Sequence, residues 1–265
     1  MRLIKADRLR MEEEGTFSEM IAGLKSDVVC DLICYRPSQA EALLQCGAGR
    51  DYQLLTAGTV WVFARNYYAP VDEKHPRTGV GEYGENKIAL ENLLLERGGR
   101  VSVIHPGHVI GRGWIPINPQ GNFNLEVLRR ISKGEEIVLP GDGARTLNPV
   151  HADDVAGVFE ACINQPEASA GEAFLAVAPQ AVTQIGYARM LYDYFGKEPA
   201  IRFASEREFY DSLNEKDAIQ SEEHVGRSPC ACSQKAIDRL GFKHRFSTFG
   251  GIADSLNALQ DMGVL

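Results

Sequence analysis

Nearly uninterrupted apolar runs, each followed by a segment of helical pattern, constrain the fold of this chain more than any other feature. The three clearest runs are Asp27–Tyr35, Tyr52–Phe63 and Val101–His105. A continuous apolar run is typical of a strand that is covered on both faces. Helical patterns follow from Pro37 and from about Glu82 to Arg97, where Gly98-Gly99 ends the second one. The alternation predicts an α/β protein, with a parallel sheet between layers of helices.

The alternation of strand and helix patterns stops after Gly111, where Gly, Pro and Asn cluster through residues 111–124. A helix over 125–133 follows, and Phe174–Val177 resembles one more buried strand. Asp153 and Asp154 are expected to cap a helix over 155–163. We therefore predict a core that carries the parallel sheet and a smaller substrate-binding lobe, mostly C-terminal. The expected core is 1–110 and 145–178, and the expected lobe is 111–144 and 179–265.

Composition excludes several functional classes. The net charge of −8 argues against a nucleic-acid partner, because phosphate binding needs concentrated Lys and Arg. Apolar runs fall short of the ~20 residues of a membrane span, and the N-terminus lacks the apolar segment of a signal peptide. Six cysteines show no disulfide framework, and Cys230-Ala-Cys232 has the wrong spacing for zinc, so we expect no metal site. These features favour the reducing cytoplasm.

Tyr83 and Lys87 are the strongest candidates for chemistry. They lie four residues apart at the start of an expected helix, so both side chains project from one face. A phenol has a pKa near 10, and a nearby ammonium favours the phenolate. The spacing therefore indicates proton transfer to or from an alcohol or a carbonyl. The alternative is an exposed helix pair without a role.

Four segments in sequence order carry a resemblance to a known family. They are Ala69-Pro70-Val71-Asp72-Glu73, Tyr83-Gly84-Glu85-Asn86-Lys87, His105-Pro106-Gly107-His108-Val109-Ile110-Gly111 and Val150-His151-Ala152-Asp153-Asp154-Val155-Ala156. Together they resemble the extended short-chain dehydrogenase/reductase family, and more narrowly its NAD-dependent epimerase/dehydratase group. The resemblance spans most of the chain. It implies a Rossmann-like sheet, NAD or NADP as cofactor, and oxidoreductase or isomerase chemistry on a small polar molecule such as a nucleotide sugar.

The resemblance also implies roles for individual residues. Tyr83 becomes the catalytic acid/base, and Lys87 binds the nicotinamide ribose and lowers the Tyr83 pKa. Asp7 falls where the family places an aspartate near the adenine, and Pro106 and Gly107 fall beside the nicotinamide. Two further residues, His108 and Trp114, face the substrate.

One departure from the family pattern concerns the hydroxyl that binds the substrate oxygen. The family has Ser or Thr where this chain has Ala57. Thr56 and Thr59 flank that position, and either can supply the hydroxyl. We favour Thr59 as the third catalytic residue, because the strand and turn around it still direct a hydroxyl at the site.

A larger departure is the glycine-rich loop that holds the cofactor's pyrophosphate. In the family a strand, a Gly-x-x-Gly-x-x-Gly loop and a helix open the chain, but the first glycine here is Gly15, already past Asp7. Residues 79–84 spell G-x-G-x-x-G, yet they follow a polar segment and not a strand, so we interpret them as a loop. The Rossmann-like sheet is therefore expected to be N-terminally truncated. Met1 is then interpretable as an internal methionine of a longer reading frame.

Two functions remain open from the sequence. The first is an NAD(P)-dependent epimerase, dehydratase or reductase that acts on a hydroxyl-bearing carbon. The alternative is a non-catalytic relative, or a fragment, that has lost dinucleotide binding. A truncated sheet also predicts an exposed strand edge, which favours a homodimer or aggregation.

Overall fold

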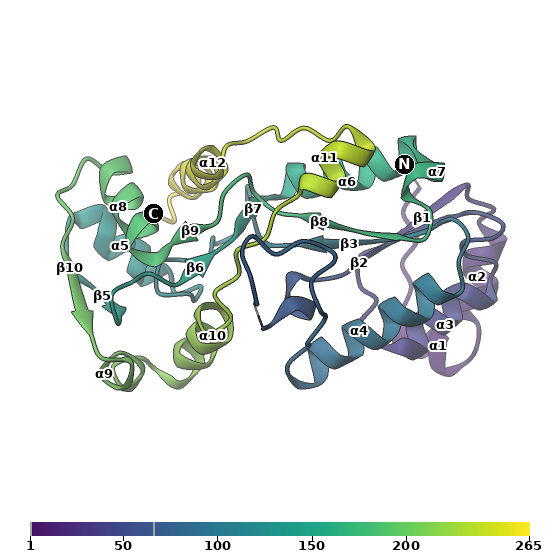
Figure 1. Cartoon of the computed structure of the whole chain (residues 1–265), viewed down its shortest axis with the longest axis horizontal. Helices are drawn as coiled ribbons and strands as arrows, with labels where there is room; N and C mark the ends of the chain where they lie inside the picture. The colour runs from purple at the N-terminus through teal and green to yellow at the C-terminus, as the bar shows by residue number, and fades with distance from the viewer. Residues whose placement is uncertain (1, 66) are drawn as a thin grey trace.

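A four-stranded parallel sheet forms the centre of the larger part of the molecule in the computed structural model, which describes residues 2–65 and 67–265 (Figure 1). In order across the sheet, the strands are β1 (Val28–Asp31), β2 (Gln53–Ala57), β3 (Val101–Pro106) and β8 (Glu172–Ala176). All three neighbouring pairs are parallel. The central strands β2 and β3 are almost wholly buried, which explains their uninterrupted apolar sequences. The predicted α/β fold with a parallel sheet is confirmed.

Helices cover both faces of this sheet (Figure 1). On one face lie α1 (Arg8–Glu13), α2 (Phe17–Gly23), α3 (Pro37–Gln45) and α4 (Gly81–Glu96). There Leu43, Leu54 and Leu90 belong to one buried cluster. On the other face lie α6 (Ala152–Asn164), α7 (Pro166–Ser169) and α11 (Gln234–Leu240). A second buried cluster there includes Val158 and Phe174.

Two of the predicted strands are shorter than their apolar runs. The first ends at Asp31, and the second ends at Ala57 and continues as a 3₁₀ helix, η1 (Val60–Phe63). The Thr59 side chain accepts a hydrogen bond from the Trp61 backbone N–H and so caps η1. Because both conformations bury apolar side chains, the pattern alone cannot tell the end of the strand from the start of the 3₁₀ helix.

The two edges of the sheet differ. On β8, Leu175 N donates to Glu73 Oε1 at 2.7 Å, and just past the strand Val177 N donates to Ser233 Oγ at 2.9 Å. Strand β1 pairs only with β2 among the described residues, and Cys30 on it is exposed. Beyond its end, Leu32 is 60% exposed. The structure thus has the exposed strand edge that the sequence predicts.

A smaller lobe is built from short strand pairs and helices (Figure 1). The pairs are β4 (His108–Ile110) with β7 (Pro149–His151), β5 (Ile137–Pro140) with β10 (Ile201–Ala204), and β6 (Thr146–Leu147) with β9 (Val182–Thr183). The helices are α5 (Leu125–Lys133), α8 (Gln184–Tyr194), α9 (Glu206–Asp211), α10 (Glu215–Val225) and α12 (Thr248–Asp261). One buried cluster that includes Leu128, Tyr187 and Leu256 holds much of this lobe together.

Two details differ from the expectations. Helix α6 is capped by His151, whose Nδ1 accepts from Asp153 N at 3.1 Å; the prediction of an aspartate cap was wrong. Asp154 is buried instead and accepts from Arg245 N at 2.6 Å. Helix α11, inside the expected lobe range, packs against β8. The division into core and lobe otherwise stays a prediction.

Within the described parts of the chain, no helix has the length and apolarity needed to cross a bilayer. Across residues 2–65 and 67–265, no three His, Cys, Asp or Glu side chains gather as a metal would require.

Candidate active site

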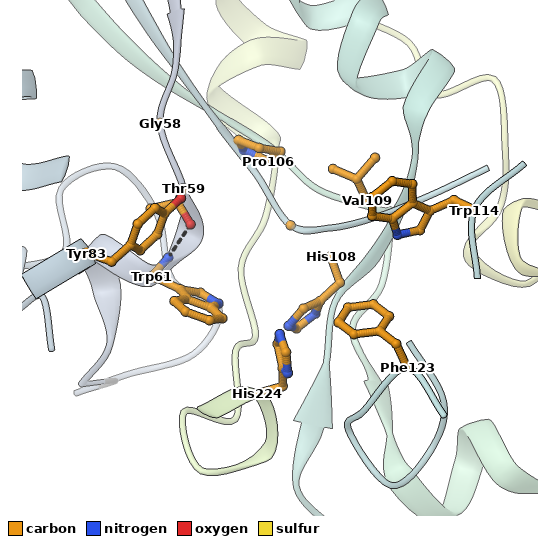
Figure 2. Close-up of a pocket in the computed structure, with 11 residues that line it drawn as sticks. Gly58, Thr59, Trp61, Tyr83, Pro106, His108, Val109, Trp114, Phe123 and His224 are labelled. Atoms are coloured by element: carbon orange, nitrogen blue, oxygen red, sulfur yellow. Dashed lines mark hydrogen bonds between the residues drawn. The ribbon is translucent and has the colours of Figure 1, made fainter. Parts of the chain in front are cut away.

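A pocket of about 490 Å³ opens at the carboxyl ends of β2 and β3, where the smaller lobe meets the sheet (Figure 2). This is the position at which open α/β sheets bind ligands. Its lining residues are Gly58, Thr59, Trp61, Tyr83, Pro106, Gly107, His108, Val109, Trp114, Phe123 and His224. Six residues singled out from the sequence are among them: Thr59, Tyr83, Pro106, Gly107, His108 and Trp114. Both tryptophans of the chain line this pocket.

One face of α4 supplies the first wall of the site. Tyr83, Lys87 and Glu91 follow each other at intervals of four residues, so they form a stripe along the helix. Tyr83, at the first turn, is 40% exposed and reaches the pocket. Lys87 and Glu91 are each 2% exposed. The stripe therefore runs from the pocket into the interior.

The Lys87 ammonium joins the ends of two strands. Its Nζ donates to Cys34 O at 2.6 Å, beyond β1, and to Ala57 O at 2.8 Å, at the end of β2. Burial lowers the Lys87 pKa, while Cys34 and Asp31 act in the opposite direction. Two of the three ammonium donors thus bond to the protein backbone, and Lys87 lies buried behind the residues that line the pocket.

The surroundings of Tyr83 favour its neutral, phenol form. Burial raises its pKa above the ordinary value of 10, and its interaction with the Thr59 hydroxyl offsets part of the increase. The Lys87 ammonium lies 5.8 Å from the centre of the Tyr83 ring, with its hydrogen bonds directed at carbonyls. A neutral Tyr83 agrees with the chemical expectation that a lysine alone lowers a phenol pKa only modestly.

Thr59 is held by a buried chain of hydrogen bonds. Thr59 N donates to His105 Nδ1 at 2.9 Å, and His105 Nε2 lies 3.3 Å from Glu91 Oε1, which Arg77 pairs at 2.9 Å. Burial alone would raise the Glu91 pKa, but His105 and Arg77 bring it below its usual value. A side chain at Gly58 would place its Cβ 2.3 Å from His105 Nδ1, so only glycine permits this approach. The Glu91 end of the stripe therefore fixes the backbone that presents Thr59.

Thr56 and Thr59, the two candidates for the hydroxyl near the substrate oxygen, differ in where they lie relative to the pocket. Thr59 lines the pocket beside Tyr83 (Figure 2), whereas Thr56 lies within β2, fully buried and outside the lining. Of the two hydroxyls, only that of Thr59 is placed to meet a ligand in the pocket.

Aromatic and imidazole rings form the opposite wall. The His108 and His224 rings lie 5.1 Å apart, and His224 lies 5.3 Å from Trp61 and 5.4 Å from Phe123. Sequence reasoning missed Trp61, Phe123 and His224. Trp61 lies two residues beyond Thr59 and could have been included on that ground. His224 comes from α10, more than a hundred residues after His108, and no sequence motif around it predicts a place in the pocket.

Asp7 lies away from this pocket. It is exposed, and its carboxylate caps α1 by accepting from Arg10 N at 3.2 Å. The structure does not bring Asp7 together with Tyr83. Its proposed contact with the adenine stays a prediction.

The Gly79–Gly84 segment forms the tightly packed entry into α4. A Cβ at Gly79 would come within 2.6 Å of the Gly84 backbone, so these glycines permit the chain to fold onto the start of α4. Among the described residues, the element immediately before α4 is the 3₁₀ helix η1 and not a strand. The interpretation of this G-x-G-x-x-G as a loop is correct only for Gly79 and Val80, because Gly81–Gly84 form the first turn of α4.

The geometry defines a class of protein: a Rossmann-like α/β fold with a tyrosine–lysine pair beside a hydroxyl at the carboxyl edge of its sheet. The chain matches the family model described as the NAD dependent epimerase/dehydratase family over residues 39–176. It belongs to that family.

A curated relative and several solved structures are similar. The 2'-dehydrokanamycin reductase of Streptomyces kanamyceticus is 27% identical over 160 residues, which cover 59% of this chain and 45% of the reductase. The chain therefore matches less than half the length of that relative.

Solved structures share the fold across nearly the whole chain. The UDP-glucose 4-epimerase of Thermotoga maritima, with UDP-glucose, has a TM-score of 0.67 at 18% identity, covering 95% of this chain and 83% of the epimerase. The UDP-glucuronic acid 4-epimerase of Bacillus cereus, with UDP-glucuronic acid and NAD, has a TM-score of 0.69 at 16% identity, covering 98% and 81%. Identities this low show the fold alone.

Proposed function

We propose that this chain is an NAD(P)-dependent epimerase, dehydratase or reductase that acts on a hydroxyl-bearing carbon of a polar substrate such as a nucleotide sugar. The observation that carries the proposal is the placement of Tyr83 above Lys87 on one face of α4, with the Thr59 hydroxyl beside the phenol. Family membership and the nucleotide sugars bound by two structural neighbours support it.

The nicotinamide end of the cofactor fits the residues present. Lys87, just behind the lining, has one ammonium donor not bonded to the backbone that would hold the ribose, and Pro106 and Gly107 line the pocket at the end of β3. When bound, the nicotinamide supplies hydride transfer at the reacting carbon. A strand followed by a glycine-rich pyrophosphate loop is not found within residues 2–65 and 67–265. The fit is therefore partial, and NAD is not distinguished from NADP.

The protein's own residues divide the proton chemistry. The Thr59 hydroxyl orients the substrate oxygen next to the Tyr83 phenol. In the reduction direction Tyr83 donates its proton to the carbonyl oxygen, and in oxidation the phenolate accepts the proton of the alcohol. Lys87 and a positively charged nicotinamide both favour that phenolate, which burial alone disfavours. His108 and Trp114 contact the remainder of the substrate.

Tryptophan fluorescence provides a direct test, because both tryptophans line the pocket. NADH, NADPH and reduced nicotinamide mononucleotide are titrated into the folded protein. The proposal expects saturable quenching by at least one dinucleotide, followed by oxidation of a nucleotide sugar such as UDP-glucose with NAD⁺ or NADP⁺. No quenching by any of the three at millimolar concentration removes cofactor-dependent catalysis by this polypeptide.

The absence of a glycine loop from the described residues favours a second candidate, a non-catalytic relative that binds without turnover. In that case Tyr83→Phe leaves the cellular phenotype unchanged, and quenching by the mononucleotide and the dinucleotides is equally weak. Loss of the phenotype in Tyr83→Phe, with binding retained, supports the enzyme.

A further inference from the structure

The imidazole of His108 has an unused donor at the wall of the pocket. His108 is 7% exposed, and its Nε2 has no hydrogen-bond partner. Its Nδ1 accepts from Asn148 N at 3.2 Å. An imidazole nitrogen that accepts carries no proton, so the proton of the neutral ring lies on Nε2. A buried N–H without an acceptor is unfavourable, which makes this nitrogen a sign of a missing ligand atom.

The facing imidazole has the complementary arrangement. His224 Nδ1 lies 2.6 Å from Gln220 O and 3.0 Å from Gly121 O, and both of these are acceptors. The proton of His224 is therefore on Nδ1, and Nε2 carries the lone pair. Figure 2 shows a nitrogen of each ring turned toward the other, with ring centres 5.1 Å apart, yet the His108 nitrogen makes no hydrogen bond to its neighbour.

Burial favours the neutral form of both rings. Burial, His224 and the nearby Arg227 lower the pKa of His108 to about 3. Burial likewise lowers the His224 pKa, although its two carbonyl partners act in the opposite direction. The donor on His108 and the acceptor on His224 are consequently retained across the physiological range.

We propose that His108 and His224 recognise one hydroxyl group of the substrate, which accepts a hydrogen bond from His108 Nε2–H and donates one to His224 Nε2. A hydroxyl is the simplest group that both donates and accepts, whereas a carbonyl or ether oxygen cannot satisfy His224. The His108 nitrogen is shielded in this structure. The proposal therefore requires the neighbouring His224 ring to move aside when the hydroxyl enters. The two histidines together would select a substrate that carries several hydroxyl groups. This inference rests on the proposed function, which supplies the class of substrate.

Side-chain nitrogen NMR tests the arrangement without requiring turnover. The full chain is labelled with ¹⁵N-histidine, and long-range ¹H–¹⁵N spectra report the tautomer of each of its six histidines. His108→Gln and His224→Gln assign the two signals. We expect the Nε2–H tautomer at His108 and the Nδ1–H tautomer at His224. The same tautomer at both positions overturns the inference.

Titration of the unsubstituted protein then tests recognition, with UDP-glucose, UDP and glycerol as probes. UDP-glucose is expected to shift both Nε2 signals, and UDP, which lacks the sugar, to shift neither. Binding of UDP-glucose that moves other signals but neither Nε2 overturns the inference and leaves the proposed function standing. If UDP-glucose does not bind at all, the nucleotide-sugar assignment fails, and the glycerol titration becomes the test. Saturable shifts of both Nε2 signals by glycerol support recognition of a hydroxyl by the two histidines, and no shift overturns it.

Binding constants for UDP-glucose provide a second measure. Each single variant is expected to weaken binding by about 3- to 10-fold, the effect of one hydrogen bond. The double variant loses less than the product of these factors, because both changes remove partners of one hydroxyl. His244→Gln, a change at a histidine outside the pocket, is the matched control and leaves binding unchanged. If the double variant weakens UDP-glucose binding by the full product of the two single factors, the two histidines do not share one hydroxyl.

Discussion

The two walls of the pocket are built in opposite ways. On one side α4 presents Tyr83 to the pocket, and behind it the buried Lys87 and Glu91 tie the helix by hydrogen bonds to the ends of β1, β2 and β3. The facing wall consists of rings such as His108, Phe123 and His224, from segments far apart in the chain. The hydrogen bonds of Lys87 and Glu91 hold α4, and with it Tyr83, in a fixed position. The second wall gives a ligand an apolar surface of defined shape and a few polar atoms to bind. Under the proposed function, chemistry and selectivity fall to separate parts of the molecule.

Removal of the phenol is the strongest test of this division. Tyr83→Phe keeps the ring and its packing but deletes the proton donor, so kcat is expected to fall by about 10²- to 10⁴-fold. Cofactor affinity, measured by tryptophan quenching, stays within about threefold because no hydrogen bond to the cofactor is assigned to Tyr83. A variant with unchanged kcat places the chemistry elsewhere and breaks the comparison.

The interior end of the α4 wall should matter for stability. Glu91→Leu leaves His105 and Arg77 without their carboxylate, and breaking such a buried pair is expected to lower the free energy of unfolding by about 3 kcal/mol. Urea denaturation measures it. Asn92→Ala, which removes the surface partner of Arg77, serves as control and costs less than about 1 kcal/mol. Equal losses of unfolding free energy in the two variants show that the buried hydrogen bonds from Glu91 through His105 are not what holds Thr59.

Acid should destabilise the ring wall selectively. The His108 pKa is lower in the folded state than the ordinary 6.5, and His224 and Arg227 are the titratable groups that face it. The unfolded chain therefore binds protons first as the pH falls, so stability present above pH 6.5 is lost progressively down to about pH 3. Between pH 7.5 and 5.0 the loss from His108 is about 2 kcal/mol.

Urea unfolding of the wild type and His108→Gln at both pH values isolates this contribution. The variant is expected to lose about 2 kcal/mol less than the wild type over the interval. Parallel losses in both proteins mean that His108 titrates normally in the folded chain.

The rim of the ring wall should give the smallest effect. Trp114 lines the pocket but is 63% exposed, so Trp114→Ala removes only part of an apolar contact with substrate. We expect KM for the nucleotide sugar to rise about threefold to tenfold, with kcat unchanged. Phe203→Ala, at an exposed aromatic residue outside the pocket, is the control. A large decrease in kcat assigns Trp114 to the chemical step.

The same contrast explains how much the sequence predicts. Tyr83, Lys87 and Glu91 lie on one helix, where a fixed period converts spacing into shared direction. The sheet was predictable for a similar reason, since buried parallel strands appear as apolar runs. His224 was not, because its place depends on how α10 docks against the loop around Gly121, through contacts roughly a hundred residues apart in sequence. The 3₁₀ turn after Thr59 was missed because its apolar residues continue the pattern of the strand.

The burial of Lys87 has a consequence for chemical labelling. An amine that is 2% exposed and hydrogen-bonded to two backbone carbonyls is closed to acylating reagents in the folded protein, even though burial lowers its pKa toward the reactive, uncharged form. Modification requires that α4 separate from the ends of β1 and β2. The rate at which Lys87 is labelled therefore measures how often α4 separates from the strand ends, and under the proposed function a bound cofactor should slow it.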